Sequence, residues 1–422
     1  MVNSVKALKI LFVFFIISTL VSQSAVDFFS VLLCGQWLWL VYSERKAGNG
    51  RPLLRAFGLE KVWLAWVFIV LVGFLLNLHR PLYMLERILE FRWIFVLYVL
   101  IEVFDYVKPD KRAINFMVWF LGLISAANIG IFFADFPSLG WLRYGSEPGG
   151  FVRAGGFFGD PMTFAHSFVL LLLLCCGLVF WSHERFSRSQ LLAMSISCGL
   201  GVVSIYLTFT RGVWVGFLAG LAFFKFLTRP VLALIVSFVL GLGSWYIYQS
   251  LSEGSAIHWR VSRTFKEIDG KSERKVIWRT HYEIFKDFPI FGAGYGQNSH
   301  LVPSYYERDG VPTGTLVSHA HNQYLHLAAG TGLLGLCCYL FIWYFFFRNL
   351  IRLWRRRDLD LWDRGLVAGL LMGQIAFCVG GLTEANFEHS KVRFMVMLMW
   401  AFGIYLANKY GVIVLRGAGR KL

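Results

Sequence analysis

Long apolar stretches separated by short polar links occupy almost the whole chain. A helix needs roughly 20 apolar residues to cross about 30 Å of hydrocarbon, because lipid offers backbone N–H and C=O groups no other partner. The pattern predicts twelve spans, at approximately 7–24, 26–42, 61–78, 91–107, 115–134, 161–181, 190–209, 212–227, 230–249, 323–347, 365–383 and 392–410. We therefore expect an all-α polytopic membrane protein with about twelve transmembrane helices.

The first stretch also has the features of a secretory signal. Lys6 and Lys9 precede its most apolar part, and Ser22-Gln23-Ser24-Ala25 resembles a cleavage site. Because a second apolar stretch follows at once, we expect the first to be retained as a span.

One polar segment, 250–322, is too long to be a simple connector. Apolar and basic side chains alternate there at helical spacing, with Ile277, His281, Ile284, Phe285 and Phe288 on one side and Arg274, Lys275, Arg279 and Lys286 on the other. We therefore expect short amphipathic helices that lie on the membrane. This divides the chain into residues 1–249 with transmembrane helices 1–9, the loop 250–322, and residues 323–422 with helices 10–12 and a tail.

Composition agrees with a membrane protein and excludes a soluble domain of this length. The chain is 57% hydrophobic and only 16% charged, with a mean hydropathy of +0.58. Its net charge of +16 could suggest a nucleic-acid-binding protein, but the basic residues lie between apolar spans. We therefore expect no nucleic-acid partner.

The basic residues also predict the orientation of the chain. Alternate sides of the predicted spans carry 24 and 17 Lys and Arg residues, and 9 of those 17 lie in the long loop. Long loops count little in the positive-inside rule. The first side, which holds both termini, is therefore predicted to be cytoplasmic, and the loop 250–322 extracytoplasmic.

Several chemistry-bearing motifs fall on the predicted outer side. Arg211, in Thr210-Arg211-Gly212, lies between two spans, where an arginine is costly unless it meets an anion or reaches the interface. Arg143 and Arg153 lie in a Gly-rich segment that ends at the predicted helix start Asp160-Pro161, and a helix N-terminus beside glycines and arginine can bind phosphate.

Glycines and histidines supply two further candidates. Gly292, Gly294 and Gly296 have no strand-helix-strand unit around them, so we expect a tight turn near a bound ligand and not a dinucleotide loop. His319 and His321, followed by Asn322, lie where the long loop re-enters the membrane. An imidazole there can take a proton from an attacking hydroxyl.

The same two histidines could instead bind a metal. No third ligand lies near them at metal-site spacing in the sequence, so no metal is expected. Glu384, in the last outer link, could orient a histidine or position a hydroxyl, and it could equally be a solvated link residue.

Together these motifs resemble the O-antigen ligase and polymerase superfamily of bacterial envelopes. His321-Asn322, Gly332 and Gly335 match the ligase pattern. In that pattern a His is followed by Asn, Ser or Gln, then by nine residues, a Gly, two residues and a second Gly. The Thr-Arg-Gly-x-Trp motif at Arg211 and the segment from Arg274 to Gly296 support it. The resemblance extends from about residue 140 to residue 400.

The resemblance implies a GT-C-like fold and a glycosyltransferase of the bacterial inner membrane that needs no metal or other cofactor. Such an enzyme moves a glycan from undecaprenyl diphosphate onto a lipid A-core sugar, with inversion at the anomeric carbon. Its other partners are the surrounding membrane lipids. His321 would be the general base and Arg211 the second catalytic residue. The expected diphosphate-binding residues are Arg153, Arg274, Arg279 and Arg143, and the expected supporting residues are His319, Asn322, Glu384, Gly294 and Gly296.

Three alternative functions stay open at the level of the sequence. An O-antigen polymerase and a protein O-oligosaccharyltransferase share the arginine and glycine features but use other acceptors. A transporter of lipid-linked glycans belongs to a different class, and it would need charged residues within the spans.

Overall fold

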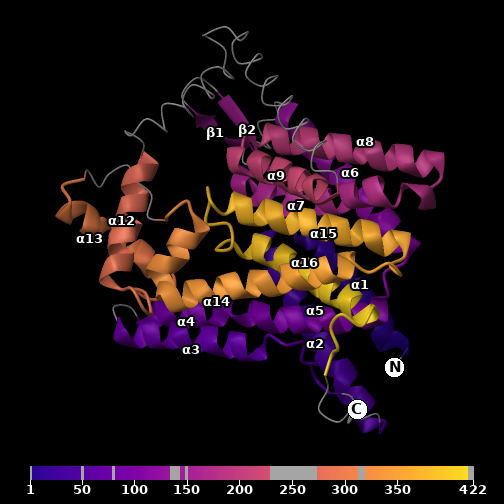
Figure 1. Cartoon of the computed structure of the whole chain (residues 1–422), viewed down its shortest axis with the longest axis horizontal. Helices are drawn as coiled ribbons and strands as arrows, with labels where there is room; N and C mark the ends of the chain where they lie inside the picture. Colours follow the sequence, from indigo (N-terminus) through magenta and orange to yellow (C-terminus); the bar gives the residue numbers. More distant parts are fainter. Residues whose placement is uncertain are drawn as a thin grey trace.

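The protein is helical apart from one short β-ribbon in the residues that the computed structural model describes, which are 2–48, 52–77, 81–133, 143–147, 151–228, 273–311 and 319–416. Helices of the main bundle (Figure 1) are α1 (Val2–Ser18), α2 (Gln23–Lys46), α3 (Glu60–Leu76), α4 (Pro81–Glu90), α5 (Arg92–Val107), α6 (Lys111–Phe133), α7 (Pro161–Trp181), α8 (Arg188–Leu207), α9 (Arg211–Thr228), α14 (Gln323–Trp354), α15 (Leu361–Gly380) and α16 (Ser390–Lys409). The long loop contributes α12 (Glu273–Asp287) and α13 (Asn298–Arg308).

Polar side chains at the links define where several helices begin. Asp160 caps α7 by accepting hydrogen bonds from the N–H groups of Met162 and Thr163, and Pro161 occupies the first turn, where its missing N–H is not needed. Ser187 and Gln190 form a reciprocal capping box at the start of α8. These residues mark where the polar links end and the apolar helices begin.

The membrane-protein class is confirmed, while the count of twelve spans stays a prediction. Seven of the described helices are long and apolar enough to cross a membrane, namely α2, α6, α7, α8, α14, α15 and α16. The predicted spans at α1, α3 and α5 have helices of 17, 17 and 16 residues, slightly short of that length. The predicted span 230–249 lies outside the described residues.

Contacts at the two ends of the bundle agree with the predicted sorting of the links, while the side of the membrane on which each end lies stays a prediction. At one end Arg185 pairs with Asp360 at 2.7 Å, Arg55 with Glu102 at 2.9 Å and Lys409 with Asp363 at 2.6 Å. At the other end, the amide of Asn77 donates to the Gly292 carbonyl at 3.2 Å. Both termini lie away from the end that carries α12 and α13 (Figure 1).

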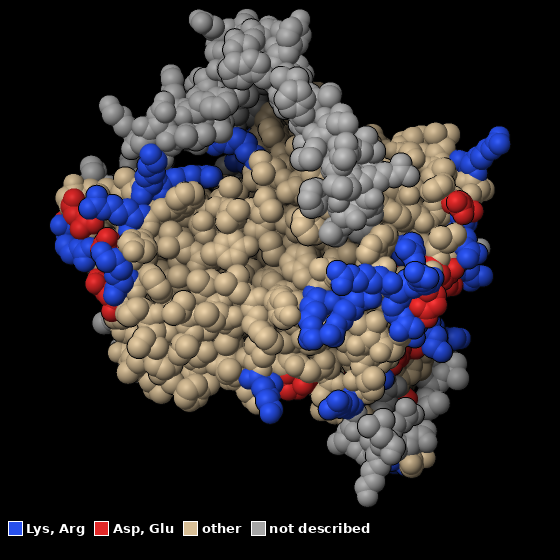
Figure 2. Space-filling model, viewed as in Figure 1, with Lys and Arg blue, Asp and Glu red and all other residues tan. Residues whose placement is uncertain are grey.

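The surface between these ends is apolar. In Figure 2 the Lys, Arg, Asp and Glu residues of the visible face gather mostly toward the two ends, and a broad band without charge separates them. Large apolar side chains on the bundle are highly exposed, including Leu64, Phe68, Leu75, Trp119 and Leu123. Exposed leucines and aromatics in this number need a lipid environment.

Glycines bring α7, α9 and α15 into close contact at the centre of the bundle. A Cβ on Gly177 of α7 would lie 2.3 Å from the Gly365 carbonyl oxygen and 2.5 Å from the Gly369 nitrogen, both on α15. On α9, a Cβ on Gly216 would lie 2.5 Å from the Ala376 carbonyl oxygen, and Gly220 is similarly close to Met372. The four-residue glycine repeat on α9 is therefore a helix-packing motif.

Replacing Gly177 by alanine is expected to destabilise the fold, because the new methyl group meets backbone atoms that cannot rotate away. Overpacking of this kind costs about 1–3 kcal/mol. Gly199→Ala is the matched control, since its Cβ would have nothing within 4 Å. Thermal unfolding in detergent should show a lower Tm for Gly177→Ala than for wild type, and an unchanged Tm for Gly199→Ala. Equal midpoints for the two variants would contradict the close packing of α7 on α15.

The predicted amphipathic helix in the long loop is confirmed as α12. Ile277, His281 and Ile284 are buried, while Lys275 and Arg279 are exposed. Its buried side packs on α14, with the rings of His281 and His326 6.0 Å apart. The loop therefore contributes a layer that covers the outer part of α14.

The glycine segment after α12 docks into a break in α14. Gly332 has φ 65° and ψ −170°, which interrupts the helix, and the N–H of Leu333 donates to the Pro289 carbonyl at 2.8 Å. A Cβ on Gly292 would lie 2.3 Å from the Thr331 nitrogen, and one on Gly332 would lie 2.2 Å from the Ile290 oxygen. The tight turn is confirmed, and the close approach of Gly292 is to protein backbone.

An antiparallel ribbon of β1 (Arg143–Glu147) and β2 (Phe151–Ala154) was not predicted. It is short and rich in glycine and charged residues, so it gives no strand pattern in the sequence. The ribbon leads through a turn of 3₁₀ helix (Gly156–Phe158) into α7.

Candidate active site

The segment His321-Asn322-Gln323 docks on the link between α15 and α16. The Asn322 side chain accepts from the N–H groups of Tyr324 and Leu325, both at 3.0 Å, and so caps α14. The same side chain donates to the Leu382 carbonyl at 3.1 Å. Gln323 adds two bonds, from its N–H to the Gly381 carbonyl at 2.7 Å and from the Phe387 N–H to its side-chain oxygen at 2.8 Å.

This docking places His321 beside Glu384. His321 Nδ1 lies 2.9 Å from Glu384 Oε2, and the two side chains are 14% and 3% exposed. The prediction that Glu384 could orient a histidine is supported, and Glu384 is not a solvated link residue. With Nδ1 facing the carboxylate, Nε2 is the ring nitrogen that can accept a proton from a substrate.

The electrostatics of Glu384 favour its charged form. Burial alone raises the pKa of a carboxyl group, but hydrogen bonds from His319 and His321 and their nearby charge outweigh burial. They hold the pKa of Glu384 well below its usual range. The carboxylate is therefore a permanent negative partner for the imidazoles at neutral pH.

The backbone of His321 itself is strained. In the described residues only Lys108, Phe209 and His321 adopt positive φ without being glycine. At φ 44°, His321 is in the left-handed region, which costs roughly 1–2 kcal/mol for a residue with a Cβ. The contacts of Asn322 and Gln323 hold it there.

His319 completes a cluster of three potential metal ligands. His319 Nε2 lies 3.4 Å from Glu384 Oε1, the two imidazole rings are 4.1 Å apart, and the three donor atoms lie within 4.8 Å of one another. The sequence argument that no third ligand lies near the histidines was wrong, because Glu384 arrives from a distant link. Two imidazoles and a carboxylate are a ligand set that zinc accepts, and their separations also suit direct hydrogen bonds.

Arg211 begins α9 at a tight turn that touches the same link. A Cβ on Gly212 would lie 1.8 Å from Thr383 Oγ1, so the start of α9 is in direct contact with the residue before Glu384. The indole of Trp214 donates to the Ile205 carbonyl at 2.9 Å and stacks on Tyr206. The fold thus brings the Thr-Arg-Gly-x-Trp motif and the His-Asn motif to one link.

Arg153 holds the turn that precedes Arg211 by hydrogen bonds to Thr208 and Thr210. Its guanidinium is buried, with Nε donating to the Thr208 carbonyl at 2.9 Å and another nitrogen to Thr210 Oγ1 at 3.2 Å. The phosphate cradle predicted at the start of α7 is wrong in one respect, because the Asp160 carboxylate already accepts from the first N–H groups of that helix. The described contacts of Arg153 are structural ones.

The other predicted arginines and glycines lie farther along the same end. Arg143 is in β1, and its side chain lies outside what the structure describes. Arg274 is partly exposed and Arg279 exposed on α12. Gly294 and Gly296 have φ of 101° and 76° in the turn that faces Gly330 of α14. No described contact joins these residues to His321.

Several buried polar residues were missed by the sequence analysis. Asn298 of α13 donates to the His326 carbonyl at 3.4 Å and lies 3.1 Å from its Nδ1. Arg393, inside an apolar span, pairs with Glu90 at 3.0 Å. An ionisable residue within an apolar span is a candidate functional residue, so the sequence alone could have identified Arg393.

Glu384→Gln is expected to reduce the rate of any reaction that uses His321 as a base by about a hundredfold or more, because a glutamine side chain no longer stabilises the protonated imidazole.

The same substitution should also change how the stability of the fold depends on pH in the acid range. Because the pKa of folded Glu384 is depressed, its contribution is complete above the usual carboxyl value of 4.5 and is lost as pH falls through the folded value. Unfolding midpoints from pH 6 to pH 3 should therefore converge for wild type and variant. A constant difference would contradict this assignment.

Residues 196–340, about a third of the chain, match the family model described as O-antigen ligase. The match includes Arg211, the α12 arginines, the glycine turn and the His-Asn motif, and it ends before the link that carries Glu384. No curated protein matches the chain.

Proposed function

We propose, from the match of residues 196–340 to the O-antigen ligase model, that the protein transfers a glycan from a polyprenyl diphosphate, undecaprenyl diphosphate in bacteria, to a sugar of lipid A-core. The reaction takes place at the outer face of the inner membrane, where both substrates are lipid-anchored. The family supports glycosyl transfer of the ligase or polymerase type. The donor, the acceptor and the roles of the residues are our proposal.

His321 is the proposed general base. Its Nδ1–H is directed to the Glu384 carboxylate 2.9 Å away, which leaves Nε2 to accept the proton of the acceptor hydroxyl. As that oxygen forms its bond to the anomeric carbon, the bond from this carbon to the diphosphate breaks, and the diphosphate leaves with the electron pair. Attack from the side opposite the leaving group gives inversion.

Arg211 is the proposed partner of the departing diphosphate. Negative charge develops on the leaving group in the transition state, and a guanidinium at the N-terminus of α9 adds to the positive field of that helix end. Arg153 holds the turn that presents Arg211, while Arg143, Arg274 and Arg279 are the candidates for reaching the diphosphate from the ribbon and from α12. Nothing in this scheme requires a metal.

The observation that carries the proposal is that the Arg211 turn and the His321-Glu384 pair contact the same link, through Gly212 with Thr383 and through the 2.9 Å bond. A polymerase or a protein O-oligosaccharyltransferase would use the same arrangement with a different acceptor.

The test incubates purified protein in nanodiscs with a lipid-linked glycan and, in separate reactions, lipid A-core, a second lipid-linked glycan, or an acceptor protein. Extension of lipid A-core alone, without ATP, is the expected result. Extension of either other acceptor alone would replace the proposed acceptor, and no extension of any acceptor would refute glycosyl transfer.

A second experiment tests whether His319, His321 and Glu384 bind a metal that transfer requires. Transfer is expected to be unchanged after dialysis against a chelator and not to increase when Zn²⁺ is returned. If the chelator abolishes transfer and Zn²⁺ restores it, His319, His321 and Glu384 hold a metal, and the proposed base is wrong.

A further inference from the structure

A polar pocket at the Glu388 end of the same link has no role in the scheme above. It has a volume of about 300 Å³ and lies between the α4–α5 corner and the start of α16. We infer that this pocket binds a sugar residue of the acceptor glycan next to the one that is modified. This inference rests on the proposed function, because it assigns the acceptor to the Glu388 end of the link, whereas the Arg211 turn contacts the Thr383 end.

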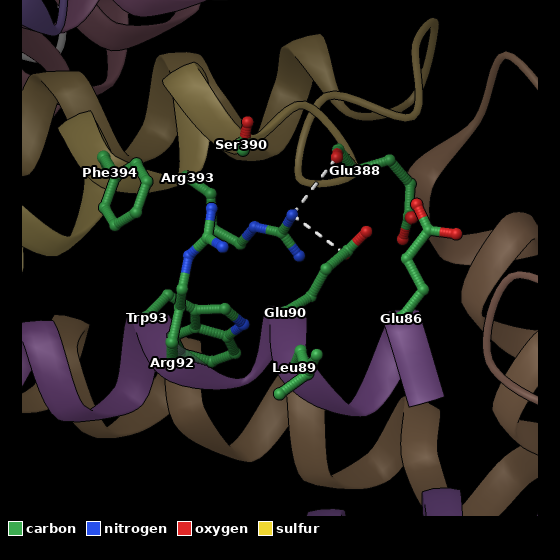
Figure 3. Close-up of a pocket in the computed structure, with 9 residues that line it drawn as sticks. All are labelled: Glu86, Leu89, Glu90, Arg92, Trp93, Glu388, Ser390, Arg393 and Phe394. Carbon is green, nitrogen blue, oxygen red and sulfur yellow. Dashed lines mark hydrogen bonds and ion pairs between the residues drawn. The ribbon is translucent and has the colours of Figure 1, made fainter. Parts of the chain in front are cut away.

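The pocket contains opposed charges that already form a fixed framework. Arg393 is only 2% exposed, and its guanidinium donates to Glu90 at 3.0 Å and to the main-chain oxygen of Glu388 at 3.4 Å. Figure 3 shows Arg393 extending across the pocket toward Glu90, with the carboxylates of Glu86 and Glu388 on one side and Trp93 and Arg92 on the other. The framework is therefore built before any ligand binds.

The lining favours a neutral ligand with many hydroxyl groups. Three carboxylates against two guanidiniums, from Arg92 and Arg393, leave no excess of positive charge, so a phosphate or diphosphate is disfavoured. Sugar hydroxyls both donate and accept, which suits carboxylates and guanidiniums together. Leu89, Trp93 and Phe394 add apolar lining against which the carbon face of a sugar can pack.

The size and position of the pocket point to the acceptor. A volume of about 300 Å³ is at the lower end for small-molecule sites, so it suits a short piece of glycan and not a polymer. Glu388 belongs to the same link as Glu384, and its N–H donates to the Ala385 carbonyl at 3.1 Å. A sugar bound at Glu388 would therefore lie on the link that also carries Glu384, the partner of the proposed base.

Two variants test the pocket without disturbing its buried framework. Leu89, 60% exposed at the pocket, is replaced by tryptophan to narrow it, and exposed Glu86 is replaced by glutamine to remove one acceptor charge. Each is expected to raise the KM for lipid A-core about tenfold, with kcat and the KM for the lipid-linked donor unchanged. Matched controls are Leu75→Trp on α3 and Glu307→Gln on α13, both at exposed positions outside the pocket.

A binding measurement separates failure of the pocket from failure of the proposed function. Saturation-transfer NMR with core oligosaccharide released from lipid A should give signals with wild type and both controls, and weaker signals with Leu89→Trp. This readout needs no turnover, so it judges the pocket even if wild type transfers nothing.

Equal signals for wild type and Leu89→Trp would overturn the inference. The inference would also be overturned if the variants raised the KM for the donor and left the KM for the acceptor unchanged. The pocket would then bind a sugar of the donor glycan. Displacement of the core oligosaccharide by phosphatidylethanolamine vesicles would assign the pocket to a lipid headgroup.

Discussion

Replacing His321 by alanine should reduce glycan transfer by about 10²–10⁴-fold, the usual contribution of a positioned general base. The loss should be in kcat, because the imidazole acts on the acceptor hydroxyl and the diphosphate is bound elsewhere. Binding of the lipid-linked donor, measured by equilibrium titration in nanodiscs, should be close to that of wild type. Single-turnover transfer with saturating donor and acceptor measures the loss directly.

The backbone of His321 requires a second variant. Alanine at φ 44° retains the strain of a left-handed residue, whereas glycine adopts that conformation freely. His321→Gly should therefore be as inactive as His321→Ala while being at least as stable. His183→Ala, an exposed position on the opposite end of the bundle, is the control and should keep full activity. Robust transfer by His321→Gly would exclude the general-base role.

Arg211→Ala should lose transfer by about 10²–10³-fold, because the charge of the departing diphosphate is no longer stabilised in the transition state. Arg211→Lys should recover part of this loss, since an ammonium supplies charge but not the planar pair of donors. Both effects should be seen with every acceptor, because the diphosphate belongs to the donor. Initial rates at varied donor concentration separate weaker donor binding from slower turnover.

Arg188→Ala is the matched control for Arg211. It also begins a helix, α8, but at the end of the bundle that carries the basic links, and its side chain is exposed. It should leave transfer unchanged. If Arg211→Ala retains wild-type kcat and donor KM, Arg211 is an interfacial anchor and the diphosphate must be stabilised by other residues.

Hydrophobic periodicity was sufficient to predict most of the helices. Spans such as 161–181 and 392–410 coincide with α7 and α16 almost to the residue, because each is one continuous apolar run bounded by polar residues. The break at Gly332 inside α14 could not be predicted, because it depends on the turn at Pro289–Gly292, some forty residues earlier, entering the helix. The second glycine of the His-Asn motif has a local reason, since a Cβ on Gly335 would lie 2.1 Å from Oγ1 of Thr331, four residues earlier in the same helix.

The candidate site was only partly predictable for the same reason. His321 and Arg211 carry local motifs, so the sequence singled them out. Glu384 lies 63 residues from His321, and only the docking of Asn322 and Gln323 on the last link shows that the two side chains meet. The contacts of Arg153 with Thr208 and Thr210 could not be predicted either, because these partners belong to another helix junction, and its role in binding a diphosphate stays a prediction.

The central claim is that the end of the bundle with His321, Glu384 and Arg211 faces the periplasm, where lipid-linked glycans are presented. Labelling of introduced cysteines with a membrane-impermeant maleimide tests it in intact cells whose outer membrane has been made permeable. Glu307→Cys, exposed on α13, should react at once, whereas Arg357→Cys, exposed at the opposite end, should react only after the inner membrane is opened. Wild type, whose cysteines all lie within helices, gives the background. Reaction of Arg357→Cys but not Glu307→Cys would place the cluster in the cytoplasm and contradict the proposed reaction.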